Sequence, residues 1–355
     1  MGDEQVARTL PLADRMVGGD HPPYVIAELS ANHGGSLESA ERVIRLAAGT
    51  GVDAVKLQTY TPDRMTLDLQ VPPFVVGSGT LWEGRTLYDL YREAQTPWEW
   101  HPRLFELAGE LGLQCFSTPF DRDAVDFLEQ FDPPAHKIAS FELLDHALIA
   151  HAASTGRPLI ISTGMATEVE IDEAVGAARS GGGGGVVLLR CNSAYPAEPD
   201  EMDLAAIPEM AERWNAPVGL SDHSVGSTAA VVAASLGACV FEKHLIGARS
   251  DGGPDSAFSA EPDELADLVA DVGLAARIRG HVRFGPSSTE AASLAFRRSL
   301  FVVQDVAAGE PFTEENVRAI RPSGGLAPKH LPAVLNRRAS VDIVRGTPLA
   351  DEHLV

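Results

Sequence analysis

Eight apolar segments alternate with helical segments between residues 24 and 278, and this alternation constrains the fold more than any other feature. The expected strands are residues 24–29, 53–60, 113–118, 135–140, 158–163, 186–193, 216–221 and 238–244. The expected helices are residues 36–50, 99–111, 121–130, 145–155, 168–180, 203–214, 226–237 and 261–278. Near-continuous apolar strands separated by helices indicate a parallel sheet that is covered on both faces. Eight such units predict a (β/α)8 TIM barrel, with an open doubly wound sheet as the alternative.

The chain is expected to have three parts. Residues 22–284 form the barrel domain, and residues 1–21 form an N-terminal tail to which we assign no role. From about residue 285 the composition changes, because a linker-like segment precedes two segments that each combine a basic pair, a strand-like run and a glycine turn. Residues 285–355 are therefore expected to be a linker and a small β-rich domain. A domain of this size buries little apolar surface, so we expect it to dock against a larger body.

Two stretches interrupt the alternation of strands and helices. Residues 61–97 form a long connection after the second strand, and connections of this length are usually functional segments or lids. Residues 180–185, SGGGGG, precede the sixth strand and are expected to be a flexible turn that serves as a linker.

Composition and charge exclude several classes of function. The net charge is −22 with 28 Lys and Arg residues, which argues against binding to nucleic acid or to an anionic membrane. No apolar run reaches the roughly 18 residues that a membrane span needs, and the acidic first residues are not those of a secretory signal. The three cysteines, Cys115, Cys191 and Cys239, lie in apolar segments without zinc spacing. They are expected to be buried reduced thiols, which predicts a cytoplasmic protein.

Polar or ionisable residues stand at the end of every expected strand, and in a TIM barrel these ends meet at one mouth. The basic and hydroxyl members are Lys56, Lys137, Thr118, Ser140, Ser162 and Ser221. Together they predict a cradle for a phosphate or carboxylate, because lysines supply charge and hydroxyls complete the hydrogen bonds. The acidic candidates are Glu28, Glu142 and Asp255, which can act as bases or bind substrate hydroxyls.

Two histidines, His223 in GLSDHSVG and His244 in FEKH, end the seventh and eighth strands. Neighbouring strand ends can bring two imidazoles onto one divalent ion with positions left open for water, as in a catalytic metal site. The alternative is a pair of hydrogen-bonding histidines. Asp222 is expected to support His223. An anion cradle, a metal pair and carboxylates in one mouth predict carbon–carbon bond chemistry on a phosphorylated small molecule.

Many ordered motifs resemble the sialic acid synthase family, also described as nonulosonic acid synthases. These are AELSANHGGSLE (27–38), AVKLQTYTPD (54–63), FSTPFD (116–121), HKIASFE (136–142), LIISTGMA (159–166), CNSAYPA (191–197), GLSDHSVG (219–226), FEKHL (241–245) and GGPDSAFSAEPDEL (252–265). The C-terminal stretch is similar to the family's antifreeze-like (SAF) domain. The resemblance implies condensation of phosphoenolpyruvate with an N-acetylated amino sugar.

Residues 79–101, with ELSANH, resemble the pseudaminic acid synthase branch of that family. The sugar that this branch implies is 2,4-diacetamido-2,4,6-trideoxy-L-altropyranose. The N-acetylneuraminate and legionaminic acid branches, which use other amino sugars, are the alternatives.

The resemblance also implies roles for individual residues. Phosphoenolpyruvate would be held by Lys56, Thr118, Lys137, Ser140, Ser162, Ser193 and Ser221. Mn²⁺ or Mg²⁺ would be bound by His223 and His244, with Glu28 acting as a base or stabilising a cationic intermediate. The sugar would be contacted by Gln58, Glu142, Tyr195, Asp255 and Arg321. Arg321 would reach from the C-terminal domain into the partner's barrel in a domain-swapped homodimer.

Three alternatives stay open at this point. The aromatic residues of the long connection and its end, Trp82, Tyr88, Tyr91, Trp98 and Trp100, either line a pocket for the sugar's deoxy methyl group or only pack the loop. Lys56 or Lys137 could instead form a Schiff base in an aldolase-type lyase. A sugar- or ice-binding protein that uses the C-terminal domain is the non-enzymatic alternative.

Overall fold

The computed structural model describes residues 8–79 and 81–355, which form two compact units. The first unit ends at Gly280 and the second runs from His281 to Val355. The break thus lies four residues before the boundary that the sequence suggests. Each unit has a core of its own, and the two are described separately here.

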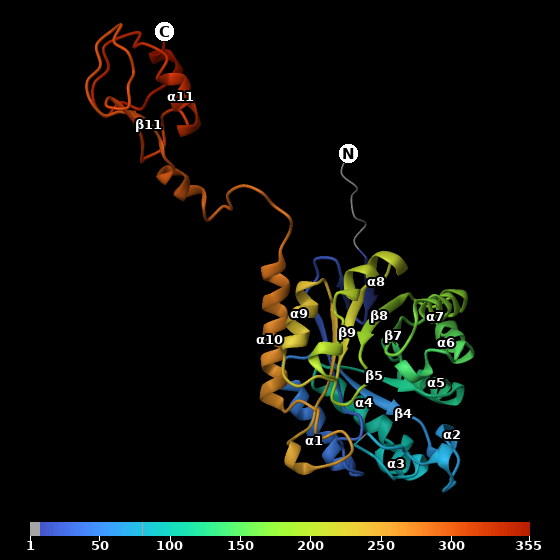
Figure 1. The fold of residues 1–355 in the computed structure, drawn as a ribbon. Helices are drawn as coiled ribbons and strands as arrows, with labels where there is room; N and C mark the ends of the chain where they lie inside the picture. The colour runs from blue at the N-terminus through green and yellow to red at the C-terminus, as the bar shows by residue number, and fades with distance from the viewer. Residues whose placement is uncertain (1–7, 80) are drawn as a thin grey trace. The chain divides into compact units, whose positions relative to one another are not determined.

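The first unit is a closed barrel of eight parallel strands, in the order β10-β3-β4-β5-β6-β7-β8-β9 (Figure 1). The strands are β3 (Tyr24–Glu28), β4 (Ala54–Thr59), β5 (Gln114–Pro119), β6 (His136–Ile138), β7 (Leu159–Ser162), β8 (Val186–Cys191), β9 (Val218–Asp222) and β10 (Val240–His244). Because β10 pairs with β3, the sheet has no edge there, and the predicted TIM barrel is confirmed over the open doubly wound sheet.

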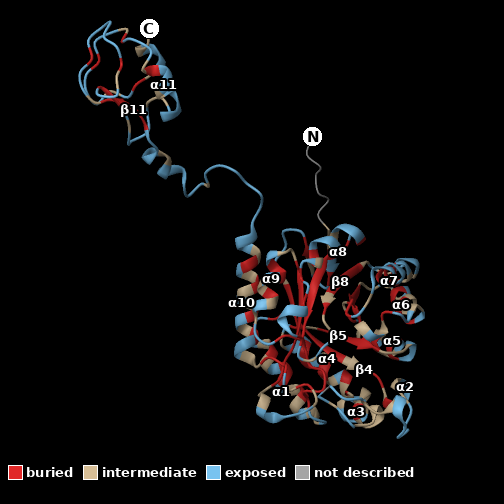
Figure 2. Cartoon of the chain, in the orientation of Figure 1, coloured by how far each residue is buried: buried red, intermediate tan, exposed pale blue. Residues whose placement is uncertain are grey.

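Helices cover the outside of the barrel, and Figure 2 shows buried strands inside a ring of helices with exposed outer faces. They are α1 (Leu37–Ala48), α4 (His101–Glu110), α5 (Arg122–Leu128), α6 (His146–Ser154), α7 (Glu168–Ser180), α8 (Ala206–Trp214), α9 (Thr228–Ser235) and α10 (Pro262–Arg279). Local sequence sets where they begin: Thr167 and Glu170 form a capping box at the start of α7. Within the described residues, none of the helices has the length and apolarity that crossing a membrane requires.

A short hairpin precedes the barrel, in the segment that the sequence analysis treated as a tail. Strands β1 (Thr9–Leu12) and β2 (Arg15–Gly18) pair in antiparallel fashion. Leu12 and Val17 are completely buried and join the barrel residues at the N-terminal ends of the strands. Arg15 bonds the Asp53 carboxylate and the Pro23 carbonyl oxygen, which ties the hairpin to the barrel wall. The hairpin therefore closes the end of the barrel opposite to the strands' carboxyl ends.

The glycine run before β8 is packed tightly, contrary to the expectation of a flexible linker. A Cβ atom added at Gly185 would lie 2.1 Å from Leu10 Cδ1 of the hairpin. One added at Gly184 would lie 2.7 Å from the Gly156 carbonyl oxygen. Larger residues would push the hairpin and the end of α6 away, so glycine is required here for close approach of backbones.

The second unit is small and mostly irregular. Strands β11 (Ser299–Val302) and β12 (Val317–Ile320) pair in antiparallel fashion, and a short helix α11 (Leu331–Val334) follows. Its core is formed by Leu300, Val302, Val306, Phe312, Val317, Val334, Ala339, Ile343 and Leu349. The unit is small, as the sequence predicts, and its described strands are short.

The long connection after β4 contains ordered elements, α2 (Pro62–Met65) and α3 (Leu87–Ala94). Between them the chain turns back on itself, with a bridge between Val75 and Thr86. The Thr86 side chain caps α3 by accepting a hydrogen bond from the Asp89 amide at 3.1 Å. We call residues 61–97 the insertion below.

Substituting Leu12→Ala tests whether the hairpin belongs to the barrel core. Because Leu12 is fully buried, we expect a loss of about 2–5 kcal/mol in the free energy of unfolding of the first unit. All four tryptophans lie in this unit, so tryptophan fluorescence in a urea titration reports on it alone. Leu69→Ala, at a side chain that is 42% exposed, is the control and should change little. An unchanged transition for Leu12→Ala would contradict the closing role of the hairpin.

Candidate active site

A cavity of about 390 Å³ opens at the carboxyl ends of the barrel strands. Of the residues predicted in the barrel, those that line it are Glu28, Lys56, Gln58, Thr118, Lys137, Ser140, Glu142, Ser162, Tyr195, Ser221, His223, His244 and Asp255. Ser193 lies beside it, with its Oγ 3.8 Å from Sγ of the lining residue Cys191. Arg321 lies in the second unit and is exposed, so its predicted role is not tested by this cavity.

Lys56 stands on the floor of the cavity between two buried carboxylates. Its Nζ lies 3.0 Å from Glu28 Oε2, 3.0 Å from Glu242 Oε1 and 3.1 Å from Thr118 Oγ1. Burial lowers the pKa of Lys56, but Glu242 and Glu28 outweigh it and raise the pKa above its ordinary value. Lys56 is therefore a permanent cation in this cavity.

Glu242 is a member of this cluster that the sequence analysis did not include in the site. It is buried, and it accepts a hydrogen bond from Ser221 Oγ at 3.3 Å. Burial raises its pKa, but Lys137 and Lys56 lower it further and keep it below its ordinary value. The sequence contained a signal for this residue: Glu242 stands two residues before His244, and side chains two residues apart on a strand face the same side of β10.

Lys137 differs from Lys56, because its bonds go to neutral oxygens. Its Nζ donates to Ser162 Oγ at 2.6 Å and to the Ile138 carbonyl at 3.0 Å. Burial lowers the pKa of Lys137 to about 8. An anion bound near this ammonium group would supply the missing counter-charge. The two lysines and the surrounding hydroxyls therefore suit a phosphate or carboxylate.

Ser30 organises the acidic side of the cavity and was also missed. Its Oγ donates to Asp255 Oδ2 and accepts from Gln58 Nε2 at 2.9 Å, and its backbone amide donates to Glu28 Oε1 at 3.0 Å. Ser30 has a φ of 45°, a left-handed conformation that is uncommon for residues other than glycine. Strain of this kind is concentrated at functional sites, where surrounding contacts maintain it.

His223 and His244 lie side by side with ring centroids 5.4 Å apart. His223 Nδ1 donates to the Asn192 carbonyl at 2.8 Å, which leaves Nε2 unprotonated when the ring is neutral. His244 Nδ1 is buried without a hydrogen-bond partner and lies 3.9 Å from Asp255 Oδ2. Burial, and then the charge of His223, lower the pKa of His244 well below its ordinary value, so that this ring is neutral.

These donors fit a divalent ion of the Mn²⁺ or Mg²⁺ kind. Two imidazoles, one with an unpartnered buried nitrogen, face a cavity that carboxylates also line. Throughout residues 8–79 and 81–355, no cluster of three or more His, Cys, Asp or Glu side chains is arranged to hold an ion. His223 and His244 are the two side chains that would hold such an ion, as the sequence predicts.

Asp222 does not support His223, contrary to the sequence-based expectation. Its carboxylate accepts from Lys243 Nζ at 2.8 Å and from Ser224 Oγ at 2.6 Å. Successive strand residues point to opposite sides, so Ser221 and His223 face the cavity while Asp222 and Lys243 face the helices. The pair is buried outside the site and stabilises the loop after β9.

The five aromatic residues of the insertion and its end divide between the two proposed roles. Trp82 and Tyr91 line the cavity. Trp98 stacks on Phe127 with ring centroids 4.5 Å apart, and Trp100 packs edge-on against His33 at 5.4 Å. The remaining one, Tyr88, bonds Asp63 at the surface. Loop packing therefore accounts for three of them and cavity lining for two.

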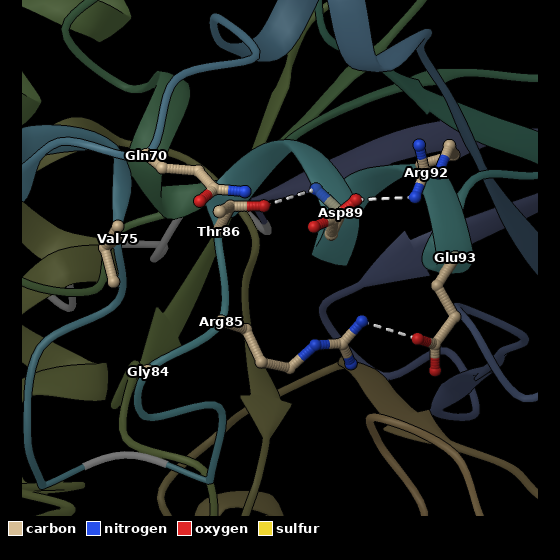
Figure 3. Close-up of a pocket in the computed structure, with 8 residues that line it drawn as sticks. All are labelled: Gln70, Val75, Gly84, Arg85, Thr86, Asp89, Arg92 and Glu93. Atoms are coloured by element: carbon tan, nitrogen blue, oxygen red, sulfur yellow. Dashed lines mark hydrogen bonds and ion pairs between the residues drawn. The ribbon is translucent and has the colours of Figure 1, made fainter.

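A second depression lies on the outer side of the insertion, and Figure 3 shows its lining residues. Its charged side chains are paired with one another, Arg85 with Glu93 at 2.5 Å and Arg92 with Asp89 at 2.5 Å. It contains none of the predicted site residues. The barrel mouth is therefore the candidate active site.

Comparisons with known proteins agree over nearly the whole chain. The sequence profile of the NeuB family matches residues 43–283, and that of the SAF domain matches residues 297–355. A pseudaminic acid synthase of Campylobacter jejuni is 42% identical, covering 94% of this chain and 96% of that protein. An N,N'-diacetyllegionaminic acid synthase of Legionella pneumophila is 34% identical, covering 93% and 94%. The crystal structure of an N-acetylneuraminic acid synthetase from Leptospira borgpetersenii, with citrate, is 30% identical with a TM-score of 0.73, covering 81% and 95%.

The pKa of Lys137 predicts how anion binding depends on pH. The ammonium group is charged below its pKa of about 8 and neutral above it, so its attraction for an anion is lost as pH rises through that value. We expect the dissociation constant for inorganic phosphate, measured by calorimetry, to rise by up to about tenfold per pH unit above pH 8. Lys137→Arg, which stays charged, should remove this dependence. A wild-type affinity that is constant from pH 7 to about 9.5 would contradict the assignment.

Proposed function

Because the chain belongs to the NeuB family, we propose that it condenses phosphoenolpyruvate with 2,4-diacetamido-2,4,6-trideoxy-L-altropyranose and water, giving pseudaminic acid and phosphate. The observation that carries the proposal is the cavity itself, where a two-lysine anion cradle, two adjacent histidines and buried carboxylates face one space. The choice of sugar is supported by 42% identity to a pseudaminic acid synthase, against 34% to a legionaminic acid synthase. Legionaminic acid and N-acetylneuraminate precursors are the alternative substrates.

Phosphoenolpyruvate binds through charge and hydroxyl groups. Lys56 is neutralised by Glu28 and Glu242, whereas Lys137 has only neutral partners and receives most of the ligand's negative charge. Thr118 and Ser162 accept hydrogen bonds from the two lysines, and the remaining hydroxyl groups of the proposed cradle are those of Ser140, Ser193 and Ser221. Buried, preorganised donors of this kind stabilise an anion without reorganising during the reaction.

The reaction moves a proton at three points. C3 of phosphoenolpyruvate attacks the aldehyde carbon of the open-chain sugar, and the aldehyde oxygen takes up a proton as it becomes a hydroxyl. Water then adds to C2 of the resulting oxocarbenium ion and releases a proton. The bond between C2 and the phosphate oxygen then breaks, the new C2 hydroxyl becomes the ketone, and its proton passes to the departing phosphate. Burial raises the pKa of Glu28 to about 7, so both of its protonation states occur near neutral pH. In its protonated form Glu28 gives the first proton, and as a carboxylate it accepts the second. Protons and charge therefore balance over the cycle.

The sugar is held opposite the cradle. Gln58 and Asp255 are fixed by their bonds to Ser30, and Tyr195 packs on His223 with ring centroids 4.3 Å apart. Burial raises the pKa of Glu142 to about 7, and its Oε2 has no partner. These groups are positioned to bind the hydroxyl and amide groups of the sugar.

A divalent ion, Mn²⁺ or Mg²⁺, held by His223 and His244 would supply Lewis-acid polarisation of the sugar aldehyde. Tyr195 and Phe258 pack on the two rings and fix their orientation, with ring centroids at 4.3 Å and 4.9 Å. The homodimer in which Arg321 serves the partner's cavity, and the cytoplasmic location, stay predictions from the sequence.

A panel of amino sugars tests the proposed reaction. With phosphoenolpyruvate, we expect fast phosphate release only in the presence of 2,4-diacetamido-2,4,6-trideoxy-L-altropyranose, with a product mass that equals the sum of both substrates and water minus phosphoric acid. Faster turnover of the legionaminic acid or N-acetylneuraminate precursor would overturn the choice of sugar. The lowered pKa of Lys137 is what a Schiff-base lyase would use, so borohydride with pyruvate is the second arm. A trapped lysine adduct would favour the lyase.

Substituting either histidine tests the metal site. We expect His244→Ala to abolish phosphate release, to lower the affinity for Mn²⁺ measured by calorimetry, and to retain the circular dichroism of the folded barrel. His281→Ala, outside the barrel, is the control and should behave as the wild type. Full activity of the wild type after exhaustive chelation, or undiminished Mn²⁺ binding by His244→Ala, would contradict the metal site and favour the alternative of two hydrogen-bonding histidines.

A further inference from the structure

The cavity has two walls of opposite chemistry. The barrel strands contribute the charged and hydroxyl groups described above. The insertion contributes a second wall, which we call the apolar wall and which consists of Met65, Val76, Trp82, Leu87, Leu90, Tyr91 and Ala94. The proposed reaction, as derived from the cradle, the histidines and the carboxylates, uses none of these residues.

Helix α3 forms the centre of the apolar wall. Its cavity-lining residues, Leu87, Leu90, Tyr91 and Ala94, follow the spacing i, i+3, i+4, i+7 and therefore lie on one face of the helix. The polar residues between them, among them Asp89 and Arg92, point to the outer depression in Figure 3. The helix is thus amphipathic, with its apolar face toward the active site.

Trp82 fixes this wall across the mouth of the barrel. Its Nε1 donates to the Pro254 carbonyl at 3.1 Å, and its ring lies 5.8 Å from that of Tyr195, centroid to centroid. The insertion follows β4, whereas Tyr195 follows β8, which stands on the opposite side of the closed barrel. The insertion therefore extends over the cavity and is held at its far side.

The apolar wall offers little to a polar group of a ligand. The side chains of Met65, Val76, Leu87, Leu90 and Ala94 have no N–H or O–H group, and Trp82 already donates its indole hydrogen to Pro254. The hydroxyl group of Tyr91 is the remaining polar side-chain group of the wall. A hydroxyl group placed against the aliphatic part of this wall, formed by Met65, Val76, Leu87, Leu90 and Ala94, would lose its bonds to water and gain no side-chain partner, whereas a methyl group would gain by leaving water.

We propose that the apolar wall is a subsite for a methyl group of the sugar and rejects sugars that carry a hydroxyl group at that carbon. This inference rests on the proposed function, since it concerns the second substrate of that reaction. The sugar has methyl groups of two kinds, the one at C6 and those of its acetamido groups. Both share the chemistry that the wall recognises, and the experiment separates them.

The test compares three sugars that differ by one oxygen atom. They are the parent 6-deoxy diacetamido sugar, its 6-hydroxy analogue and its N-glycolyl analogue, each with saturating phosphoenolpyruvate. We expect kcat/KM for one hydroxylated analogue to be roughly 10- to 100-fold below that of the parent, which is the range that an unpaired hydroxyl in an apolar pocket gives. The analogue that is rejected identifies the methyl group.

Val76→Thr is the decisive variant, because it replaces one methyl group of the wall by a hydroxyl group at nearly constant volume. We expect it to reduce the discrimination between parent and rejected analogue by roughly threefold or more. Val75→Thr makes the same change one residue earlier, where Val75 lines the outer depression (Figure 3), and should keep the wild-type ratio. Met65→Gln is a second wall variant, at a half-buried side chain, should Val76→Thr not fold.

The outcomes separate this inference from the proposed function. If none of the three sugars releases phosphate, the proposed function fails and the inference with it. If the parent is a substrate but both analogues are used equally well, the function stands and the apolar subsite is overturned. The subsite is also overturned if an analogue is rejected but Val76→Thr and Met65→Gln leave the ratio of kcat/KM between parent and analogue unchanged. A change of that ratio by Val75→Thr as large as the change by Val76→Thr overturns it too.

Discussion

The buried ion cluster of Lys56, Glu28 and Glu242 is the interaction on which the active-site end of the barrel depends. Each of the three residues is at most 4% exposed, and each charge would be costly if its partners were absent. Strand register brings them together, because Glu28 on β3 pairs with Lys56 on β4 and Glu242 comes from β10 on the other side of β3. The first and last strands of the barrel must be neighbours for the cluster to form. Barrel closure and the charge balance of the mouth therefore require one another.

Local charges, and not the net charge of −22, decide whether the mouth of the barrel can bind an anion. Glu28 and Glu242 hold Lys56 in its charged form, so that the local field at the cradle is set by neighbours a few ångströms away. Lys137 bonds only neutral oxygens, and the charge of Glu242 raises its pKa too little to offset burial, which lowers it. A bound phosphate would restore the missing partner. Low pKa and affinity for an anion thus have the same cause, which is an uncompensated buried ammonium group.

Much of this site could be predicted from the sequence, because the strand period and the barrel topology convert position in the chain into position in space. Lys56, Lys137, His223 and His244 were found at strand ends, and all of them line the cavity. The prediction for Asp222 was wrong, since residues next to one another on a strand face opposite sides. Contacts far apart in the sequence were beyond prediction. The bond between Ser30 and Asp255 joins residues that are 225 positions apart. The position of the hairpin likewise depends on the closed barrel, because it packs on the barrel end opposite to the carboxyl ends of the strands.

The insertion and the barrel contribute in different ways to what the cavity binds. The polar groups stand on short strands that are hydrogen-bonded to a neighbour on each side in the closed barrel, which fixes their geometry. Reacting groups need this precision. The apolar wall comes from a single connection between β4 and α4, which can change in sequence without disturbing the strand register. A methyl group needs only a surface of the right shape that excludes water, and one helical face provides this. The arrangement therefore separates the chemistry of bond formation from the choice of the second substrate.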